Sequence, residues 1–335
     1  MKYRETPEKS RENKATYAKG FEHIIQKRLQ QMTAERKKYA ADIFKEPERY
    51  RADLKAILGW PLVGYEDTGL PPVKAQKLSD EEGYTVWRME FEVMEGLVLT
   101  GLLFRQESEK PLPLVLVQHG KLGTPELISG IYDKTGNYND MLSRVIRCGV
   151  HAFAPQLLLW SEGYEVPYDR DALDIRLKHL GGSVTAVEVH ALGKLLDYFE
   201  TQEYVKNFGM VGLSYGGFYT LFTAALDTRI RSSISCSFFN TMEKYFMADW
   251  MWFNSARRFD AAEVACLAYP RRLCLEMGDN DSIFDLADSV ASFERIQEMC
   301  REVGTDWVEF IGFPGTHEFC LYDEPIQRLA EDLKK

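Results

Sequence analysis

A serine occupies the centre of a glycine-rich turn in the segment GMVGLSYGGFYT, residues 209–220. Within this segment, GLSYG forms a G-x-S-x-G motif centred on Ser214. Where a strand turns directly into a helix, the central residue is strained, and glycine is needed two positions before and after it to avoid collisions. Such a turn exposes the serine hydroxyl, and the free amides of the new helix favour negative charge beside it. The pattern predicts that Ser214 is a nucleophile.

The motif alone is weak evidence, because its three fixed positions recur by chance in roughly one chain in ten of this length. A tight packing turn with a serine that has no catalytic role would show the same sequence motif. A dinucleotide-binding turn requires G-x-G-x-x-G, and a phosphate-binding P-loop requires a Lys-Ser/Thr pair; this turn has neither pattern. The position of Ser214 between an apolar strand-like segment and an apolar helix-like segment favours the nucleophile.

A catalytic serine needs a base that accepts its proton and a carboxylate that orients the base. On a strand-turn-helix nucleophile, these partners follow the serine in the order acid, then histidine. Of the six histidines, only His317 follows Ser214, and it lies in the loop GFPGTHEF after an apolar segment. We therefore predict that His317 is the base. His119 ends an earlier apolar segment, so it is a candidate to line the site but precedes the serine.

Three aspartates are candidates for the orienting carboxylate, all in the segment RLCLEMGDNDSIFD. We predict Asp281, which follows the apolar run in a G-x-x-D pattern, and keep Asp279 as the alternative. Asp285 better suits the first turn of the following helix, where a negative charge is favourable. Helix capping alone would also explain an aspartate at these positions.

Short apolar segments alternate with helical patterns through most of the chain. Continuous apolar strands separated by helices indicate a parallel sheet covered on both faces, which is the α/β class. In such a sheet, functional residues gather at the carboxyl ends of the strands. A hairpin over residues 84–105, broken at Glu95-Gly96, is predicted to form an antiparallel edge. The expected further strands are LPLVLVQHG, VHAFAP, FGMVGLS, IRSSISCSFF, RLCLEMG and WVEFIGF.

The predicted domains are a helical extension over residues 1–75 and a catalytic domain over residues 76–335, with a cap insertion at about 238–268. Aromatic residues in the cap would either wall a substrate pocket or seal the cap onto the body. The segment PQLLLWSEGY is a second candidate wall. The charged cap residues Asp249, Arg257 and Arg258 are expected to face solvent, with binding of a polar substrate group as the alternative. The aromatic residues of the cap are Phe238, Phe239, Tyr245, Phe246, Trp250, Trp252 and Phe253.

The N-terminal segment is basic and the rest of the chain is acidic. Residues 1–60 contain 15 Lys and Arg against 9 Asp and Glu, which gives a net charge of +6. Because the whole chain has a net charge of −10, residues 61–335 have a net charge of −16. Phe21, Ile25, Leu29 and Met32 recur at helical spacing, which predicts one apolar stripe. The charge difference favours a basic helix lying on an acidic body, its own or a neighbour's, over a nucleic-acid-binding arm. We therefore expect no nucleic-acid partner, and the extension is a candidate contact for a homo-oligomer if it lies on a neighbour's body rather than its own.

The composition excludes several other classes of protein. With 45% hydrophobic and 27% charged residues, the chain can bury a globular core. No window approaches the roughly 18 apolar residues of a membrane span, and the start MKYRETPEKSRENK lacks the apolar core of a secretory signal. The six cysteines are scattered without a CxxC pair. These features predict a cytoplasmic protein with reduced thiols, no membrane contact, no metal and no organic cofactor.

Four motifs, VLVQHG, GLSYGG, GDNDSIF and GTHEF, follow one another in an order that resembles the α/β-hydrolase superfamily over residues 84–335. Within it, the chain is most similar to the serine esterases and peptidases grouped around dienelactone hydrolase and acetyl xylan esterase. The resemblance implies an oxyanion hole formed by the backbone amides of Tyr215 and Lys121, with Gly120 as the alternative to Lys121. Dienelactone hydrolases use a cysteine nucleophile, so Ser214 argues against that particular activity.

The residues and the resemblance together predict a serine hydrolase that forms an acyl-enzyme on Ser214. The expected substrate is a carboxylic ester of a small molecule, such as an acetyl or short acyl ester of a sugar. One alternative is a prolyl-oligopeptidase-like peptidase or amidase, although the roughly 80 residues before the hairpin are too few for a propeller domain. The other alternative is a non-catalytic binding module on the same fold.

Overall fold

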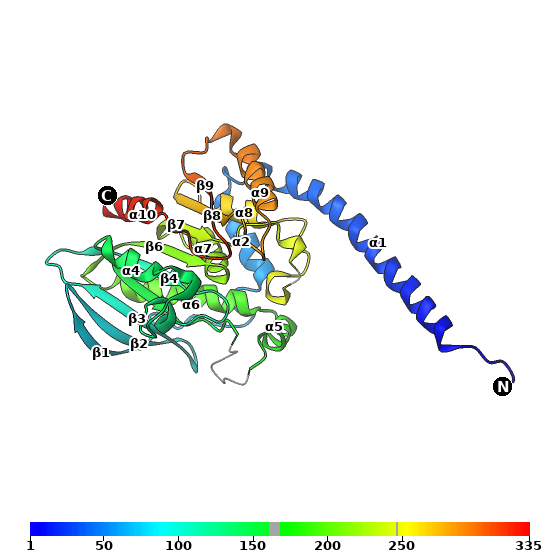
Figure 1. Cartoon of the computed structure of the whole chain (residues 1–335), viewed down its shortest axis with the longest axis horizontal. Helices are drawn as coiled ribbons and strands as arrows, with labels where there is room; N and C mark the ends of the chain where they lie inside the picture. Colours follow the sequence, from blue (N-terminus) through cyan, green and yellow to red (C-terminus); the bar gives the residue numbers. More distant parts are fainter. Residues whose placement is uncertain (161–167, 246) are drawn as a thin grey trace.

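The computed structural model describes residues 1–160, 168–245 and 247–335, in which one large sheet is flanked by helices (Figure 1). Nine strands of this described part pair in the order β1-β2-β3-β5-β4-β6-β7-β8-β9. This mostly parallel sheet confirms the predicted α/β class. The strands are β1 (Val73–Glu81), β2 (Tyr84–Met94), β3 (Leu97–Gln106), β4 (Leu112–Gln118), β5 (His151–Pro155), β6 (Val205–Leu213), β7 (Ile230–Cys236), β8 (Arg272–Gly278) and β9 (Val308–Phe313).

The antiparallel edge of the sheet consists of β1, β2 and β3. The predicted hairpin corresponds to β2 and β3, which pair antiparallel and turn at Glu95-Gly96, and β3 joins the parallel strands through β5. The first strand, β1, was not predicted, because its sequence VKAQKLSDE reads as polar. It pairs only with β2 and is exposed along most of its length, so it needs no apolar face. Charged residues on such an outer strand also discourage edge-to-edge aggregation.

The six predicted apolar strands are confirmed as β4 to β9, and they run parallel to one another. Two hydrophobic clusters cover the two faces of this sheet. On one face lie α4 (Met141–Arg147) and α10 (Glu324–Lys334). On the other lie α2 (Pro47–Leu58), α6 (Val184–Glu200), α7 (Tyr215–Leu226) and α8 (Ala261–Cys266), with α9 (Leu286–Met299) beside α8.

The remaining helices and 3₁₀ turns connect or flank these layers, and some of them add buried side chains such as Ile128 and Trp250 to the two clusters. They are α1 (Pro7–Tyr39), α3 (Pro125–Ile128) and α5 (Arg170–His179), with 3₁₀ turns η1 (Ala40–Asp42), η2 (Gly136–Tyr138), η3 (Met242–Lys244), η4 (Ala248–Trp250) and η5 (Cys300–Glu302). The cap region predicted at about 238–268 therefore contains two 3₁₀ turns and the short helix α8 rather than a regular layer. Within the described ranges, no helix is both long and apolar enough to cross a membrane.

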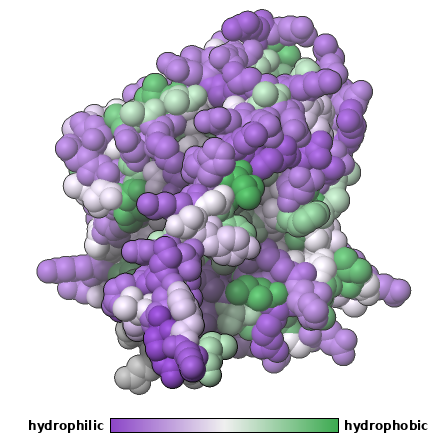
Figure 2. Space-filling model, turned by 90° about the vertical axis from the view of Figure 1, so that its right-hand side faces the viewer, coloured by the Kyte–Doolittle hydropathy of each residue, from purple (hydrophilic) through white to green (hydrophobic). Residues whose placement is uncertain are grey.

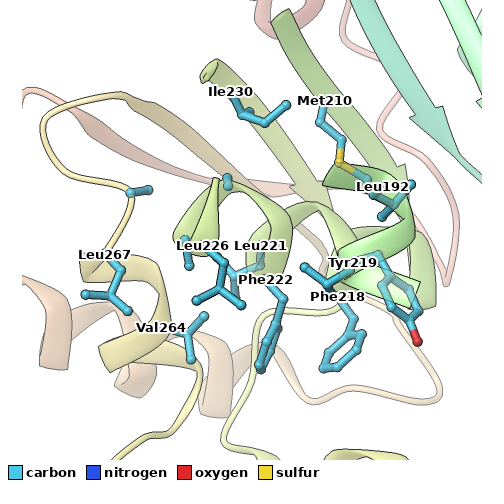
Figure 3. Close-up of a cluster of buried hydrophobic side chains, with 14 of the residues drawn as sticks. Leu192, Met210, Phe218, Tyr219, Leu221, Phe222, Leu226, Ile230, Val264 and Leu267 are labelled. Carbon is cyan, nitrogen blue, oxygen red and sulfur yellow. The ribbon is translucent and has the colours of Figure 1, made fainter. Parts of the chain in front are cut away.

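Helix α7 is the central helix of the fold and begins directly after the candidate nucleophile. Every residue of its sequence YGGFYTLFTAAL is buried, which fits a helix that is apolar on all sides. Figure 3 shows α7 between sheet residues such as Met210 and Ile230 and the α8 residue Val264. A helix held on several sides fixes the position of its own N-terminus, and Ser214 lies there.

The N-terminal segment divides into two parts with different surroundings. Helix α2 packs into the main core through Tyr50, Leu54 and Leu58, all of which are buried. Helix α1 instead projects away from the body, as the blue helix of Figure 1 shows. Of the predicted stripe on this helix, Met32 is buried, whereas Phe21 is exposed.

Candidate active site

Ser214 lies in a strained turn between β6 and α7. Its backbone has φ 58° and ψ −121°, a combination that non-glycine residues rarely adopt. A Cβ on Gly212 would lie 2.3 Å from the carbonyl oxygen of Gly216, and a Cβ on Gly216 would lie 2.1 Å from that of Gln118. The motif's two glycines are therefore required by the close approach of β6, α7 and the end of β4, as the sequence pattern implied.

His317 and Asp281 form a direct hydrogen bond between the loops after β9 and β8. The imidazole Nδ1 lies 2.8 Å from Asp281 Oδ2. Because a carboxylate only accepts, the ring carries its proton on Nδ1 and presents the lone pair of Nε2. The other carboxylate oxygen, Oδ1, accepts the amides of Ile283 at 2.8 Å and Phe284 at 3.1 Å. The Asp281 side chain is thus fixed at three points.

The charge state of Asp281 follows from these contacts. Burial alone would raise the pKa of this carboxyl group, since its side chain is fully buried. The hydrogen bonds from His317 and from the amides of Ile283 and Phe284 outweigh burial and lower the pKa below its ordinary value. Asp281 therefore remains ionised at neutral pH, which is the state that can orient an imidazole and stabilise its protonated form.

The two other candidate aspartates have different partners. Asp279 Oδ1 accepts the amide of Gly315 at 3.1 Å, so this residue braces the loop that carries His317. Asp285 accepts the amide of Ala287 at 2.9 Å and caps α9, as its position suggested. The geometry thus favours Asp281 over Asp279 as the partner of the histidine.

Ser214 and His317 lie at the same edge of the sheet, and the end of β7 connects them. The Ser214 amide donates to the Cys236 carbonyl at 2.8 Å. The next residue, Ser237, donates its hydroxyl to the carbonyl of Glu318 at 3.1 Å, immediately after His317. In the described part of the chain, the Ser214 hydroxyl makes no hydrogen bond. Such catalytic contacts are often long in a free enzyme and shorten when substrate binds.

Aromatic rings form a second connection between the elbow and the histidine loop. Tyr215 packs on Trp250 with ring centroids 5.0 Å apart, and Trp250 stacks on Phe284 at 6.2 Å. Phe284 in turn contacts the His317 ring at 5.7 Å. Because Phe284 also donates its amide to Asp281, this aromatic row supports both members of the histidine–aspartate pair.

Backbone amides near Ser214 are available for a developing negative charge. The first helical hydrogen bond of α7 runs from the Phe218 amide to the Ser214 carbonyl, so the Tyr215 amide precedes the helical pattern. The Gly120 amide donates to the Tyr138 hydroxyl at 2.9 Å and is already occupied. The Lys121 amide has no hydrogen-bond partner among the described residues. Of the two alternatives on this loop, the geometry favours Lys121.

His119 fixes the loop that carries Lys121. Burial lowers the pKa of His119 to about 4, so the ring is neutral at physiological pH. Its Nδ1 donates to the Gly120 carbonyl at 2.9 Å, and its Nε2 accepts the amide of Leu157 at 3.2 Å. The Leu122 amide adds a bond to the Leu159 carbonyl at 2.8 Å. His119 therefore positions the loop from beneath, a more specific role than the lining expected from the sequence.

A buried set of charged side chains lies beneath the elbow. Arg170 donates to Asp249 at 3.0 Å and to Glu188 at 2.9 Å, and all three side chains are buried. Tyr215 donates its hydroxyl to Asp249 at 3.0 Å. The expectation that Asp249 faces solvent is wrong, because Arg170 compensates its charge inside the protein. Arg257 is exposed, as expected.

This buried set ties the two loops of the site together. Glu188 accepts the Leu158 amide at 2.8 Å, and Leu158 lies in the segment that binds the His119 loop. Because Tyr215 is joined to the same set through Asp249, the elbow and the loop after β4 share one internal support. The sequence contained no signal for this support: the three charged residues are far apart in the chain and follow no motif.

Most aromatic residues of the cap fill its interior. Phe238, Phe239, Trp250 and Trp252 are buried, which agrees with the alternative in which they seal the cap onto the body. Phe253 is 96% exposed, and Phe246 lies outside the described residues. Of the second candidate wall, residues 161–164 also lie outside them, whereas Trp160 packs against Tyr215 at 4.8 Å.

No cluster of three or more potential metal-ligating side chains occurs within residues 1–160, 168–245 and 247–335. The six cysteines are free thiols, and only Cys148 is partly exposed.

Comparison with solved structures identifies proteins of the same fold. A provisionally assigned acetyl xylan esterase from Bacteroides fragilis superposes with a TM-score of 0.66 at 18% identity, over 82% of this chain and 76% of its own. A glucuronoyl esterase from Solibacter usitatus gives 0.60 at 15% identity, over 84% and 91%. Another from Teredinibacter turnerae gives 0.60 at 16% identity, over 87% and 86%. Neither a protein-family model nor a curated protein matches the sequence.

These similar proteins are esterases of the α/β-hydrolase superfamily. Their identity to this chain is low, so the likeness defines the fold and leaves the reaction to be argued from the residues. It confirms the predicted α/β-hydrolase fold, with a mostly parallel sheet and helices around it.

Proposed function

We propose that this protein, which has the α/β-hydrolase fold, is a serine hydrolase that cleaves carboxylic esters through an acyl-enzyme. The observation that carries the proposal is the 2.8 Å contact between His317 and a fully buried, ionised Asp281 at the sheet edge where Ser214 occupies a strained turn. A structural turn has no need of an imidazole held in one tautomer at the same sheet edge. Such an arrangement serves to remove a proton from a hydroxyl.

In the proposed reaction, Ser214 Oγ attacks the ester carbonyl carbon while His317 Nε2 accepts the hydroxyl proton. The resulting oxyanion is stabilised by the amides of Tyr215 and Lys121 and by the N-terminus of α7. The tetrahedral intermediate then expels the alcohol, which takes the proton from His317. Water attacks the acyl-enzyme with His317 again as base, and the carboxylic acid leaves with Ser214 restored.

The fixed geometry beneath the site supports this mechanism. The His119 ring and the Arg170–Asp249–Glu188 set brace the two separate loops that carry the proposed oxyanion amides. Preorganised donors stabilise a transition state without reorganising during the reaction, so such internal support has a direct catalytic value. A binding module without chemistry would not require it.

The names of the similar structures favour an ester over an amide. They are esterases, including an acetyl xylan esterase and glucuronoyl esterases, so we propose an acyl ester on a carbohydrate as the substrate class. The prolyl-oligopeptidase-like alternative retains the same nucleophile turn. An assay with one substrate of each kind distinguishes the two leaving groups.

The purified protein is expected to hydrolyse acetylated xylo-oligosaccharides with a higher kcat/KM than a matched prolyl-amide substrate, because the similar solved structures are esterases. Release of acetate and of the amine would be measured side by side, with Ser214→Ala as the blank for each substrate. Faster cleavage of the prolyl amide would support the peptidase alternative. Equal rates for the parent and the blank on both substrates would support the binding module.

A further inference from the structure

Helix α1 carries an apolar surface that no described residue covers. Tyr17, Phe21, Ile24 and Ile25, here called the α1 stripe, lie on one side of the helix and are 43% to 72% exposed. Tyr17 and Phe21 contact each other edge to face at 5.0 Å. All residues from Pro7 to Arg28 are exposed, so this part of α1 touches little besides itself.

The α1 stripe continues the surface by which the same helix docks on the body. Met32 and Arg36 follow the stripe at helical spacing, and both are buried. Arg36 binds Glu243 at 2.7 Å and Asp260 at 3.3 Å, so the C-terminal end of α1 is firmly held. One face of α1 therefore has the side chains of a protein contact surface. Only the C-terminal end of this face packs against the described residues of the same chain.

An exposed helix of this kind is unfavourable on its own. Most helical stability in proteins comes from burying one face against other elements, and residues 7–28 of α1 have no such burial. The α1 stripe leaves four large apolar side chains in solvent, and burying them against a partner would be favourable. A partner surface would recover this free energy and hold the helix in place.

Charge indicates what the partner is. Residues 1–60 have a net charge of +6, and the rest of the chain carries −16. Contact between the acidic bodies of two molecules is unfavourable, and so is contact between their two basic helices. Contact between the basic helix of one molecule and the acidic body of another is favourable. The α1 stripe is itself flanked by Lys14 and Arg28. It therefore fits an acidic surface with apolar side chains, which the body of this protein provides.

The body also exposes an aromatic residue near the base of α1. Phe253 is 96% exposed, and it lies three residues from Ala256, whose carbonyl accepts Arg36 at 2.6 Å. Figure 2 views the side of the molecule from which α1 projects and shows hydrophobic side chains among the hydrophilic surface of the body. A helix entering this region from another molecule would find apolar contact, on a body whose net charge as a whole is negative.

We infer that α1 is an association arm, and that its stripe is covered by the acidic body of a second copy of this chain. The inference is independent of the proposed hydrolysis. An anionic membrane is the competing surface for a basic helix, but membrane-binding helices bury a broad apolar face. The α1 stripe is narrow and is bounded at its two ends by Lys14 and Arg28, which favours protein.

The test compares the solution mass of three full-length proteins by sedimentation velocity. The parent is expected to have twice the monomer mass at low salt and to dissociate as salt is raised. Phe21→Glu/Ile24→Glu places two carboxylates in the stripe and is expected to be monomeric. Gln26→Glu/Gln30→Glu adds the same charge on the opposite face of α1, where both glutamines are exposed, and is expected to remain dimeric.

Each result decides the inference. A monomeric parent at the highest soluble concentration would overturn it, as would a parent dimer that Phe21→Glu/Ile24→Glu leaves intact. Dissociation of the control variant as well would mean that net charge, and not the stripe, drives association. Binding to phosphatidylserine vesicles is measured as the last comparison. If the parent is monomeric and binds the vesicles, and Phe21→Glu/Ile24→Glu does not bind them, the stripe is a lipid-binding surface and the inference is overturned. Far-ultraviolet circular dichroism confirms that each variant is folded.

Discussion

Ser214→Ala is expected to lower kcat for hydrolysis of p-nitrophenyl acetate by about 10⁶-fold, to a rate close to background. The reason is that alanine removes the atom that forms the acyl-enzyme, while the strained turn and its packing remain. Removal of one hydroxyl from a half-buried side chain leaves the core unchanged, so the variant should unfold at the same denaturant concentration as the parent. Initial rates with background subtracted, together with a urea unfolding curve, measure both effects.

Ser282→Ala is the matched control for this prediction. Ser282 is an exposed serine next to Asp281 at the same edge of the sheet, and it has no proposed role. Its loss should leave kcat within a factor of about two, as expected for a surface substitution away from special features. A Ser214→Ala protein that retained a tenth of the parental rate would show that the hydrolysis proceeds by another route.

Asp281→Asn is expected to lower kcat by about 10⁴-fold with little change in KM. An asparagine can occupy the same space, but its amide can donate to His317 Nδ1 and so favour the tautomer with the proton on Nε2. That tautomer cannot accept the serine proton. The variant also loses the negative charge that stabilises the protonated imidazole during the reaction. Steady-state kinetics across pH 6 to 9 would separate kcat from KM.

Asp279→Asn tests the alternative on the same loop. Asp279 accepts the Gly315 amide, and an asparagine carbonyl can accept that bond in its place. We therefore expect activity within about tenfold of the parent, since the loop is retained and only a charge is lost. If Asp279→Asn were the severely impaired variant and Asp281→Asn the active one, the assignment of the two aspartates would be reversed.

The sequence predicted the sheet because its strands are buried on both faces. A parallel strand covered by helices reads as a continuous apolar run, and the runs before His119, Ser214 and Asp279 were identified in this way. The edge strand β1 was missed for the opposite reason, because a strand that is exposed along most of its length carries no apolar signal. Chain order then reduced the possible bases to His317.

The internal support of the site could not be predicted from the sequence. Arg170, Glu188 and Asp249 are charged residues on separate segments, and such residues are usually exposed. Their burial depends on mutual neutralisation, which exists only once the fold has brought them together. The sequence also could not decide whether the Gly120 or the Lys121 amide is the second oxyanion donor. That decision depends on the hydrogen bond from the Gly120 amide to the Tyr138 hydroxyl, which forms only in the folded protein.

The central claim is that the hydroxyl at position 214 is chemically activated in the folded protein. Labelling with a fluorophosphonate, followed by peptide mapping, tests this claim without knowledge of the natural substrate, because the reagent forms a stable adduct only with an activated nucleophile. We expect one adduct per chain, located on Ser214, and none after urea unfolding. A folded protein that stays unlabelled, or one labelled at a different residue, would contradict the account.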